Sequence, residues 1–308
     1  GRNYTVGYEK LNARRTEWEW LLDRIFEQGK SLSALDRCIG QEIKELGKPA
    51  FRHQIVLGLP EAIRGQKDWG EIDGREMDFS KEEDQIAATK WYIGELVERF
   101  KAAKYKHLEL SGFYWVAEDT HHCAELTIPL SEYIHSEGKL FYWIPYWQAK
   151  GHEEWKRLGF DVAYQQPNHF FNHSIPDSRL DEACATARRH GMAMEFEFDE
   201  KATAAIPNSS HDRMAAYINH FEKNDVFNSS AVAYYCGNRG VLTLDESDNP
   251  KDKALMDRLA RIIQARRYLK YGIPMKNKTR VVAHRRLGTE FDRLAPQGRP
   301  AGRVRRGI

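Results

Sequence analysis

The run Gly191-Met192-Ala193-Met194-Glu195-Phe196-Glu197-Phe198-Asp199 alternates apolar and acidic side chains. Successive side chains of a β-strand point to opposite faces, so the methionines and phenylalanines would share one face and the acids the other. A solvated strand could carry such acids without a function. An unbroken apolar face opposite three acids is nevertheless typical of a barrel strand, whose outer face packs on helices. Like charges crowded at a barrel mouth raise one another's pKa and can keep one carboxyl group protonated as a general acid.

The bulk composition bounds the possible classes of protein. A chain of 308 residues with 41% hydrophobic residues is long enough for one α/β barrel or two smaller domains. The net charge of +2 hides an uneven distribution, because residues 276–308 hold ten Lys and Arg against two acids. The preceding residues hold 37 basic and 43 acidic residues. A mildly acidic body argues against a nucleic-acid groove, and we expect no nucleic-acid partner.

The C-terminal segment 276–308 is rich in Arg, Gly and Pro and has no hydrophobic period. Binding to nucleic acid or to an anionic surface is one interpretation. We favour a solvated, poorly ordered extension. The sequence therefore predicts one barrel domain over residues 1–275, followed by this extension.

Cysteine usage and hydropathy exclude some classes of site and partner. The four cysteines lie far apart without a Cys-x-x-Cys pair, which leaves zinc or thioredoxin-like redox chemistry poorly supported; they are Cys38, Cys123, Cys184 and Cys236. No apolar stretch approaches the ~20 residues of a membrane span, and the N-terminus lacks the pattern of a secretory signal. We expect a monomer with no membrane partner.

Strands and helices are expected to alternate along the chain. The predicted strands are residues 54–59, 107–115, 140–147, 161–166, 192–198 and 231–236. The predicted helices are residues 18–29, 32–46, 80–103, 153–158, 180–190, 212–224 and 253–271. Ser80 and Glu83 have the spacing of a capping box. The connections are too long for hairpins, so the sheet should be parallel.

This alternation fits either a (β/α)8 TIM-type barrel or an open, doubly wound α/β sheet. Polar and aromatic residues follow the carboxyl ends of at least five strands, where barrel enzymes build their sites. No Gly-x-Gly-x-x-Gly turn follows any strand, so the nucleotide-binding signature of an open sheet is missing. Only six strands are predicted and the chain opens on a helix. We therefore expect a barrel that is incomplete at its N-terminus, with its first strand upstream of residue 1.

Two carboxylate positions lie three strands apart, hence across the predicted barrel mouth. Glu118 falls just past strand 107–115, and Glu195 and Glu197 lie in strand 192–198. Glycoside cleavage needs one carboxylic acid and one carboxylate that acts as nucleophile or base. We predict Glu118 as the acid/base and Glu197 as the second carboxylate, although the choice between Glu197 and Glu195 is open. Glu118 could instead be a loop carboxylate that caps the next helix.

Aromatic and amide side chains also lie at neighbouring strand ends. Together with the acids they form a set of residue types that is typical of carbohydrate sites. Aromatic faces stack on the C–H faces of sugars, and amides both donate to and accept from hydroxyl groups. Some of these rings could equally belong to the core. The predicted substrate-binding residues are Tyr114, Trp115, Trp143, Tyr146, Trp147, Gln165, Gln166, Asn168, Asp199 and Tyr235.

Metal ligation is the remaining chemistry that the histidines suggest. His121-His122 is one candidate pair, and His169 with His173 is another. The second pair would share a helical face, but its intervening residues are typical of a loop. We therefore predict no metal and no cofactor.

Six segments together resemble a bacterial family catalogued as domain of unknown function 4855. They are Trp18-Glu19-Trp20-Leu21-Leu22-Asp23, Leu57-Gly58-Leu59-Pro60-Glu61, Gly112-Phe113-Tyr114-Trp115, Trp143-Ile144-Pro145-Tyr146, Gln166-Pro167-Asn168 and Glu195-Phe196-Glu197. The resemblance covers about residues 4–272. It implies a glycosidase-type barrel from carbohydrate-degrading bacteria, extracellular or periplasmic, whose first strand precedes Tyr4.

The leading hypothesis is a glycoside hydrolase that acts on a poly- or oligosaccharide without a cofactor. The first alternative is a non-catalytic barrel that binds carbohydrate. A second alternative is a metal-dependent esterase or lyase that uses the acidic strand as ligands.

Overall fold

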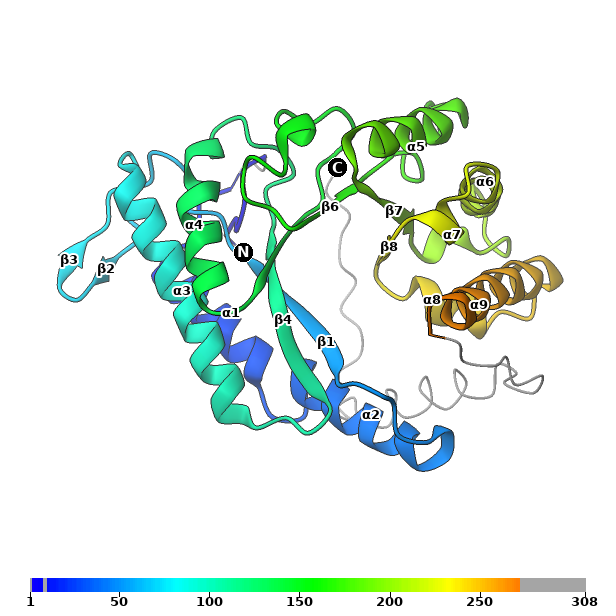
Figure 1. The fold of residues 1–308 in the computed structure, drawn as a ribbon, viewed down its shortest axis with the longest axis horizontal. Helices are drawn as coiled ribbons and strands as arrows, with labels where there is room; N and C mark the ends of the chain where they lie inside the picture. The colour runs from blue at the N-terminus through cyan, green and yellow to red at the C-terminus, as the bar shows by residue number, and fades with distance from the viewer. Residues whose placement is uncertain (1, 8–9, 272–308) are drawn as a thin grey trace. The chain divides into compact units, whose positions relative to one another are not determined.

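The computed structural model describes residues 2–7 and 10–271 of the chain (Figure 1). The basic segment 276–308 lies outside the described residues, so its predicted character stays a prediction. The chain divides into two compact units. The first comprises Gly1–Glu197 and Ala216–Tyr235, and the second comprises Phe198–Ala215 and Cys236–Ile308. The single domain expected over residues 1–275 also stays a prediction.

A curled six-stranded sheet, built almost entirely by the first unit, carries the site described below. Its strands, in spatial order, are β1 (His53–Leu59), β4 (Leu108–Trp115), β5 (Leu140–Trp143), β6 (Val162–Gln165), β7 (Ala193–Phe198) and β8 (Val232–Cys236). Neighbouring strands from β1 to β7 pair in parallel. The sequence-based expectation of a parallel α/β sheet is therefore confirmed, as are the positions of its six strands. β5 and β6 end earlier than predicted, because Pro145 and Pro167 follow and proline has no N–H for the ladder.

Helices cover one face of this sheet. In the first unit they are α1 (Arg15–Phe26), α2 (Ser31–Leu46), α3 (Glu82–Ala103), α4 (Ala124–Ser136), the short η1 (His152–Glu154), α5 (Ser178–His190) and α7 (Val226–Ser229). α3 packs against α1, α4 and β1, while α4 packs against β5 and α5 against β6. A small hairpin, β2 (Glu71–Ile72) with β3 (Arg75–Glu76), precedes α3.

The second unit is helical. It contains η2 (Glu200–Ala202), α8 (Gly240–Asp245) and α9 (Pro250–Tyr271), and α8 packs on both η2 and α9. α6 (His211–Lys223) begins in this unit and continues into the first. Buried Asp252 stabilises the unit, because its carboxylate accepts hydrogen bonds from the Ala204 N–H and the Ser247 hydroxyl, at 2.7 and 2.6 Å.

The two faces of β1 differ in burial. In β1, Ile55 and Leu57 are buried, whereas Gln54 and Val56 on the other face are exposed. Gln54 Nε2 donates to Glu109 Oε2 of β4 at 3.2 Å, so this second face is polar. Glu109 thus forms a hydrogen bond between neighbouring strands. The face opposite the helices is the one available to a ligand.

The helices differ from the sequence-based expectation at several points. The segment 153–158, predicted as a helix, holds only the 3-10 helix η1, and the short helices α7 and α8 were not predicted. Ser80 does not cap α3, because Asp78 Oδ1 accepts both its hydroxyl, at 2.6 Å, and its N–H, at 3.0 Å. The helix begins instead at Glu82 after Lys81. Helix α4 occupies a segment that we predicted as loop.

Within the described residues, no helix combines the length and apolarity that crossing a membrane requires.

Candidate functional site

The carboxyl ends of the parallel strands bring the three predicted acids together. Glu118 lies three residues beyond β4, and Glu195 and Glu197 lie within β7. The charge of Glu118 contributes to the raised pKa of both β7 carboxyl groups, so all three acids interact across the concave face of the sheet. The structure thus brings the three acids together, while their placement across a barrel mouth and their catalytic roles stay a prediction.

Glu195 is buried and has a strongly raised pKa. Its side chain is only 6% exposed. Burial, followed by the nearby charges of Glu197 and Glu118, raises the pKa of Glu195 to about 9. Among the described residues, no donor lies within hydrogen-bond distance of this carboxyl group. Glu195 is therefore protonated and neutral near pH 7.

Glu197 lies two residues further along the same strand face but in a different environment. Its Oε2 accepts hydrogen bonds from the Tyr217 hydroxyl and from the His169 N–H, the latter at 3.3 Å. Burial raises the pKa of Glu197, and these donors, with the Asn168 N–H, oppose that rise. Burial and the charge of Glu197 raise the pKa of Tyr217, so the phenol keeps its proton. Of the two β7 acids, Glu197 is the one with hydrogen-bond donors that favour its ionised form, and these donors oppose the net rise of its pKa without reversing it.

Glu118 is the accessible member of the group. Its side chain is exposed, yet the surrounding protein partly desolvates the carboxyl group and raises its pKa, against a hydrogen bond from the Gln166 side chain. A cleft of about 380 Å³ borders Glu118 and is also lined by Glu61, Asp119 and Tyr146. Neither β7 acid lines this cleft. Of the three acids, Glu118 is thus the one that a ligand in the cleft would meet first.

Glu61 is a site residue to which the sequence reasoning gave no role. It follows β1 at the same edge of the sheet and is buried. Its Oε2 accepts hydrogen bonds from the Thr5 hydroxyl at 2.7 Å and the Val6 N–H at 2.9 Å. The carboxylate therefore anchors residues 5 and 6 as a wall of the cleft. The position of Glu61 just after a predicted strand was the sequence signal that could have identified it as a site residue.

Exposed aromatic rings surround this edge of the sheet. Tyr146 is 38% exposed and Tyr235, at the end of β8, is 50% exposed. Phe171, which the sequence reasoning did not single out, is 48% exposed and meets Tyr235 edge-on, with ring centroids 5.7 Å apart. Trp147 is partly exposed, and the Arg179 guanidinium lies 4.7 Å from its ring centroid. Such rings can stack on a sugar.

Three other predicted aromatic residues lie deeper. Trp115 and Trp143 are fully buried and present no ring face to solvent. Trp143 stacks on Phe160 at 5.0 Å, and its Nε1 donates to the Ala117 carbonyl at 2.8 Å. Both tryptophans therefore belong to the core, because strand-end rings fill the space between sheet and helices. Tyr114 is partly buried, and burial, with Glu118 and Glu195, raises its pKa.

The predicted amides hold the loops of the site in place. Gln165 is fully buried, and its Nε2 donates to the Tyr146 and Gln166 carbonyls at 3.3 and 3.0 Å. Gln166 Nε2 donates to the Ile144 carbonyl at 2.9 Å, and its Oε1 accepts from Asn168 Nδ2 at 2.9 Å. These contacts join the segments that follow β5 and β6.

Asp199 belongs to the second unit, where its side chain caps η2. Its Oδ1 accepts the Lys201 N–H at 2.8 Å. Burial raises the pKa of Asp199, and this hydrogen bond opposes the rise. A helix cap accounts for an acid at this position.

The two predicted histidine pairs have other contacts. His169 is fully buried, and its Nε2 lies 2.8 Å from Asp177 Oδ1. His121 Nδ1 lies 3.2 Å from the Lys150 ammonium.

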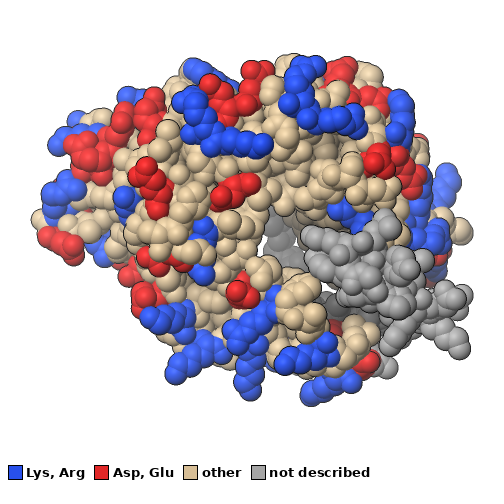
Figure 2. All heavy atoms as spheres, in the orientation of Figure 1, with Lys and Arg blue, Asp and Glu red and all other residues tan. Residues whose placement is uncertain are grey.

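Acidic and basic side chains are interspersed over the face of the molecule in Figure 2, where the described residues form no extended area of one sign.

The fold and the site define the chain as an α/β protein whose parallel sheet carries three interacting acids at its carboxyl edge. The family described as "Domain of unknown function (DUF4855)" matches residues 4–261, and the chain belongs to this family. The expected family resemblance is thereby confirmed. A solved structure described as "a putative alpha-L-fucosidase from Bacteroides thetaiotaomicron VPI-5482" is similar at 14% identity and a TM-score of 0.38. That similarity spans 58% of this chain and 62% of the other. No curated protein matches the chain.

Proposed function

We propose that this protein is a glycoside hydrolase that cleaves a poly- or oligosaccharide with paired carboxylates. The observation that carries the proposal is the contrast within β7, where neutral Glu195 adjoins Glu197, whose ionised form three donors stabilise. Pairs of acids whose environments separate their pKa values are a common arrangement for acid–base catalysis. The exposed Glu118, with its raised pKa, adds an acid that a ligand can reach.

The proposed roles follow from accessibility and charge. Glu118 donates a proton to the leaving glycosidic oxygen, because it borders the cleft and its pKa is raised. Glu197 acts as nucleophile or as the base that activates water, since its donors favour the carboxylate. Glu195 remains protonated throughout and reduces the negative charge next to Glu197. Tyr146, Phe171 and Tyr235 contact the sugar rings.

We also infer that the six parallel strands belong to a (β/α)8 barrel. The strands follow one another in sequence order from β4 to β8 with one helix-covered face, which is the arrangement of consecutive barrel strands. A barrel places the carboxyl ends of β4 and β7 across a common mouth, which suits the proposed pairing of Glu118 with Glu197.

Reducing-sugar release across a panel of plant, algal and bacterial glycans tests the proposed activity. We expect release from at least one glycan and a loss of about 100-fold or more in Glu197→Gln. Glu109→Gln is the matched control, because Glu109 is a carboxylate on β4 whose only assigned role is structural. Glu195→Gln should keep most activity, since a neutral amide resembles the protonated acid. Full activity in both Glu118→Gln and Glu197→Gln would contradict the proposal.

A non-catalytic carbohydrate-binding protein is the second candidate function. The observation that favours it is that both β7 acids are nearly inaccessible, at 6% and 3% exposure, and neither lines the cleft. Calorimetric binding of a glycan that the protein does not cleave would support this candidate over the hydrolase.

A further inference from the structure

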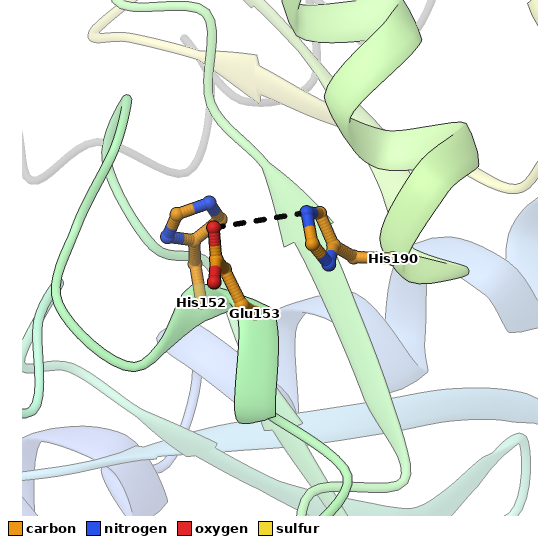
Figure 3. A group of neighbouring side chains, drawn as sticks. All are labelled: His152, Glu153 and His190. Atoms are coloured by element: carbon orange, nitrogen blue, oxygen red, sulfur yellow. Dashed lines mark ion pairs between the residues drawn. The ribbon is translucent and has the colours of Figure 1, made fainter.

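His152, Glu153 and His190 form a second group of chemically capable side chains (Figure 3). One ligand atom from each lies within 4.8 Å of the other two. His190 Nε2 is 4.0 Å from Glu153 Oε1, and the two imidazole rings meet edge-to-face with centroids 5.6 Å apart. The three side chains thus converge from η1 and from the last residue of α5.

The backbone on both sides of this group is held firmly. Gly151 has φ +88°, and a Cβ at this position would lie 2.1 Å from Thr120 Oγ1, so only glycine fits before His152. On the other side, the buried Trp155 donates from Nε1 to the His190 carbonyl at 2.9 Å. These contacts fix the separation of the two histidines without any help from their side chains.

The hydrogen bonding of His152 leaves a lone pair available. Its Nδ1 lies 2.6 Å from the Ala149 carbonyl, which can only accept, so Nδ1 carries the proton. Nε2 is then the unprotonated nitrogen of the neutral ring. Metal-bound histidines usually donate their other N–H to a carbonyl or carboxylate in this manner.

The group lies away from the carboxylates of the proposed hydrolase. His190 precedes the first residue of β7, Ala193, whereas Glu197 lies four residues further along the strand. At ~3.3 Å per residue, those four residues span about 13 Å. His190 therefore lies before the amino end of β7, whereas the two β7 acids lie further along the strand toward its carboxyl end.

We propose that His152, Glu153 and His190 bind one divalent transition-metal ion, with Zn²⁺ the ion that they suit best. Two imidazoles and one carboxylate are borderline ligands that suit zinc, with water in the fourth position. Bonds of about 2.0–2.1 Å require the ligand atoms to move closer together. The exposed Glu153 side chain has the freedom for this movement. The bound ion joins η1 to the end of α5.

Calorimetric titration of the metal-stripped full chain with Zn²⁺ tests the site. We expect binding of one ion per chain and a melting temperature that rises with zinc. His190→Ala and Glu153→Gln should each weaken binding about tenfold or more. Glu154→Gln is the matched control, because this neighbouring acid pairs with Arg157 at 2.6 Å and should leave binding unchanged.

Two results would overturn this proposal: no one-to-one binding of zinc, or equal binding by the two variants and the control. Melting without zinc shows whether His190→Ala still folds, and exposed Glu153 provides a variant with little effect on packing. The site does not depend on the proposed hydrolase function. Zinc binding with no glycan cleavage would contradict only the hydrolase, and cleavage without zinc binding would contradict only the metal site.

Discussion

Asp181 of α5 and Glu195 of β7 show two ways in which one unit holds a desolvated acid. Burial disfavours the charged form of Asp181, but Lys223, His220 and Asn224 donate to its carboxylate at 2.7, 2.9 and 2.6 Å. These donors lower its pKa to about 2. Glu195 is more deeply buried, faces two other acids, and has its pKa raised to about 9.

The contrast separates structural acids from candidate functional ones. A paired carboxylate such as Asp181 contributes to stability, whereas an acid buried among like charges reduces stability once it ionises. Arrangements of the second kind are concentrated at functional sites, because they tune acid–base chemistry at the expense of stability. Three predictions test this contrast, and a fourth tests the exposed aromatic rings.

Glu195→Gln should produce the largest change in stability. Between the unfolded pKa of about 4.3 and the folded pKa near 9, the folded protein keeps a proton that the unfolded chain releases. Wild-type stability therefore falls as pH rises, by up to ~1.4 kcal/mol per pH unit, and the variant lacks this slope. Urea unfolding at several pH values between about 5 and 9 measures the difference. Parallel curves for wild type and variant would contradict the assignment of Glu195 as a neutral acid.

Tyr217→Phe should lower stability by about 1–3 kcal/mol, because it removes a donor from a buried carboxylate. Loss of the donor also raises the pKa of Glu197, so the acid limb of the pH–activity profile should move to higher pH. Tyr164→Phe is the control, since Tyr164 lies on neighbouring β6 without contact to Glu197. An equal effect of both substitutions would contradict the role of Tyr217 as the hydrogen-bond donor to Glu197.

Asp181→Asn should lower stability by about 1–2 kcal/mol near pH 7, after allowance for the partial exposure of Asp181. The contribution of Asp181 is fully present above the unfolded pKa of about 3.9. It is lost as pH falls through about 2, so wild type and variant should converge in acid. Thermal unfolding at neutral and acidic pH measures this effect, with the fully exposed Asp212→Asn as control. A gap that persists in acid would show that packing, rather than charge, stabilises Asp181.

Tyr235→Ala should have the smallest effect, a loss of glycan affinity of about two- to tenfold with unchanged folding. Tyr235 and Phe171 together offer an exposed pair of rings near the acids. Trp20→Ala is the matched control, because Trp20 is 55% exposed, close to the 50% of Tyr235, but lies on α1. Titration calorimetry with the best-binding glycan compares the two variants, and equal losses would contradict a stacking role for Tyr235.

Local patterns were sufficient to predict the sheet. Each strand coincides with an apolar or alternating run of residues. The long connections between the runs predict that the strands pair in parallel. The same reasoning missed α4, where the buried stripe of Leu126, Leu130 and Ile134 is interrupted by buried Thr127 and Ser131. Pro129 inside the helix further obscures the pattern, because proline normally ends a helix.

Glu118 could be singled out because it follows a strand end, where a barrel builds its site, and Glu195 and Glu197 because they share one face of an alternating strand. The hydrogen-bond partners that give the acids different environments could not be predicted. Tyr217 reaches Glu197 from a helix twenty residues further along the chain, and its contact depends on the register of α6. His152 and His190 are likewise brought together only by where η1 and α5 end. Long-range contacts of this kind depend on tertiary packing, which single-sequence patterns do not encode.

The hydrogen bond from Trp143 Nε1 to the Ala117 carbonyl gives the protein an intrinsic optical probe. Trp143 is fully buried, and Ala117 immediately precedes Glu118. A ligand that moves the Glu118 backbone would alter this bond and with it the fluorescence emission of the indole. Occupation of the cleft that moves this backbone would therefore be visible without a label, and Trp143→Phe identifies the share of the signal that arises beside Glu118.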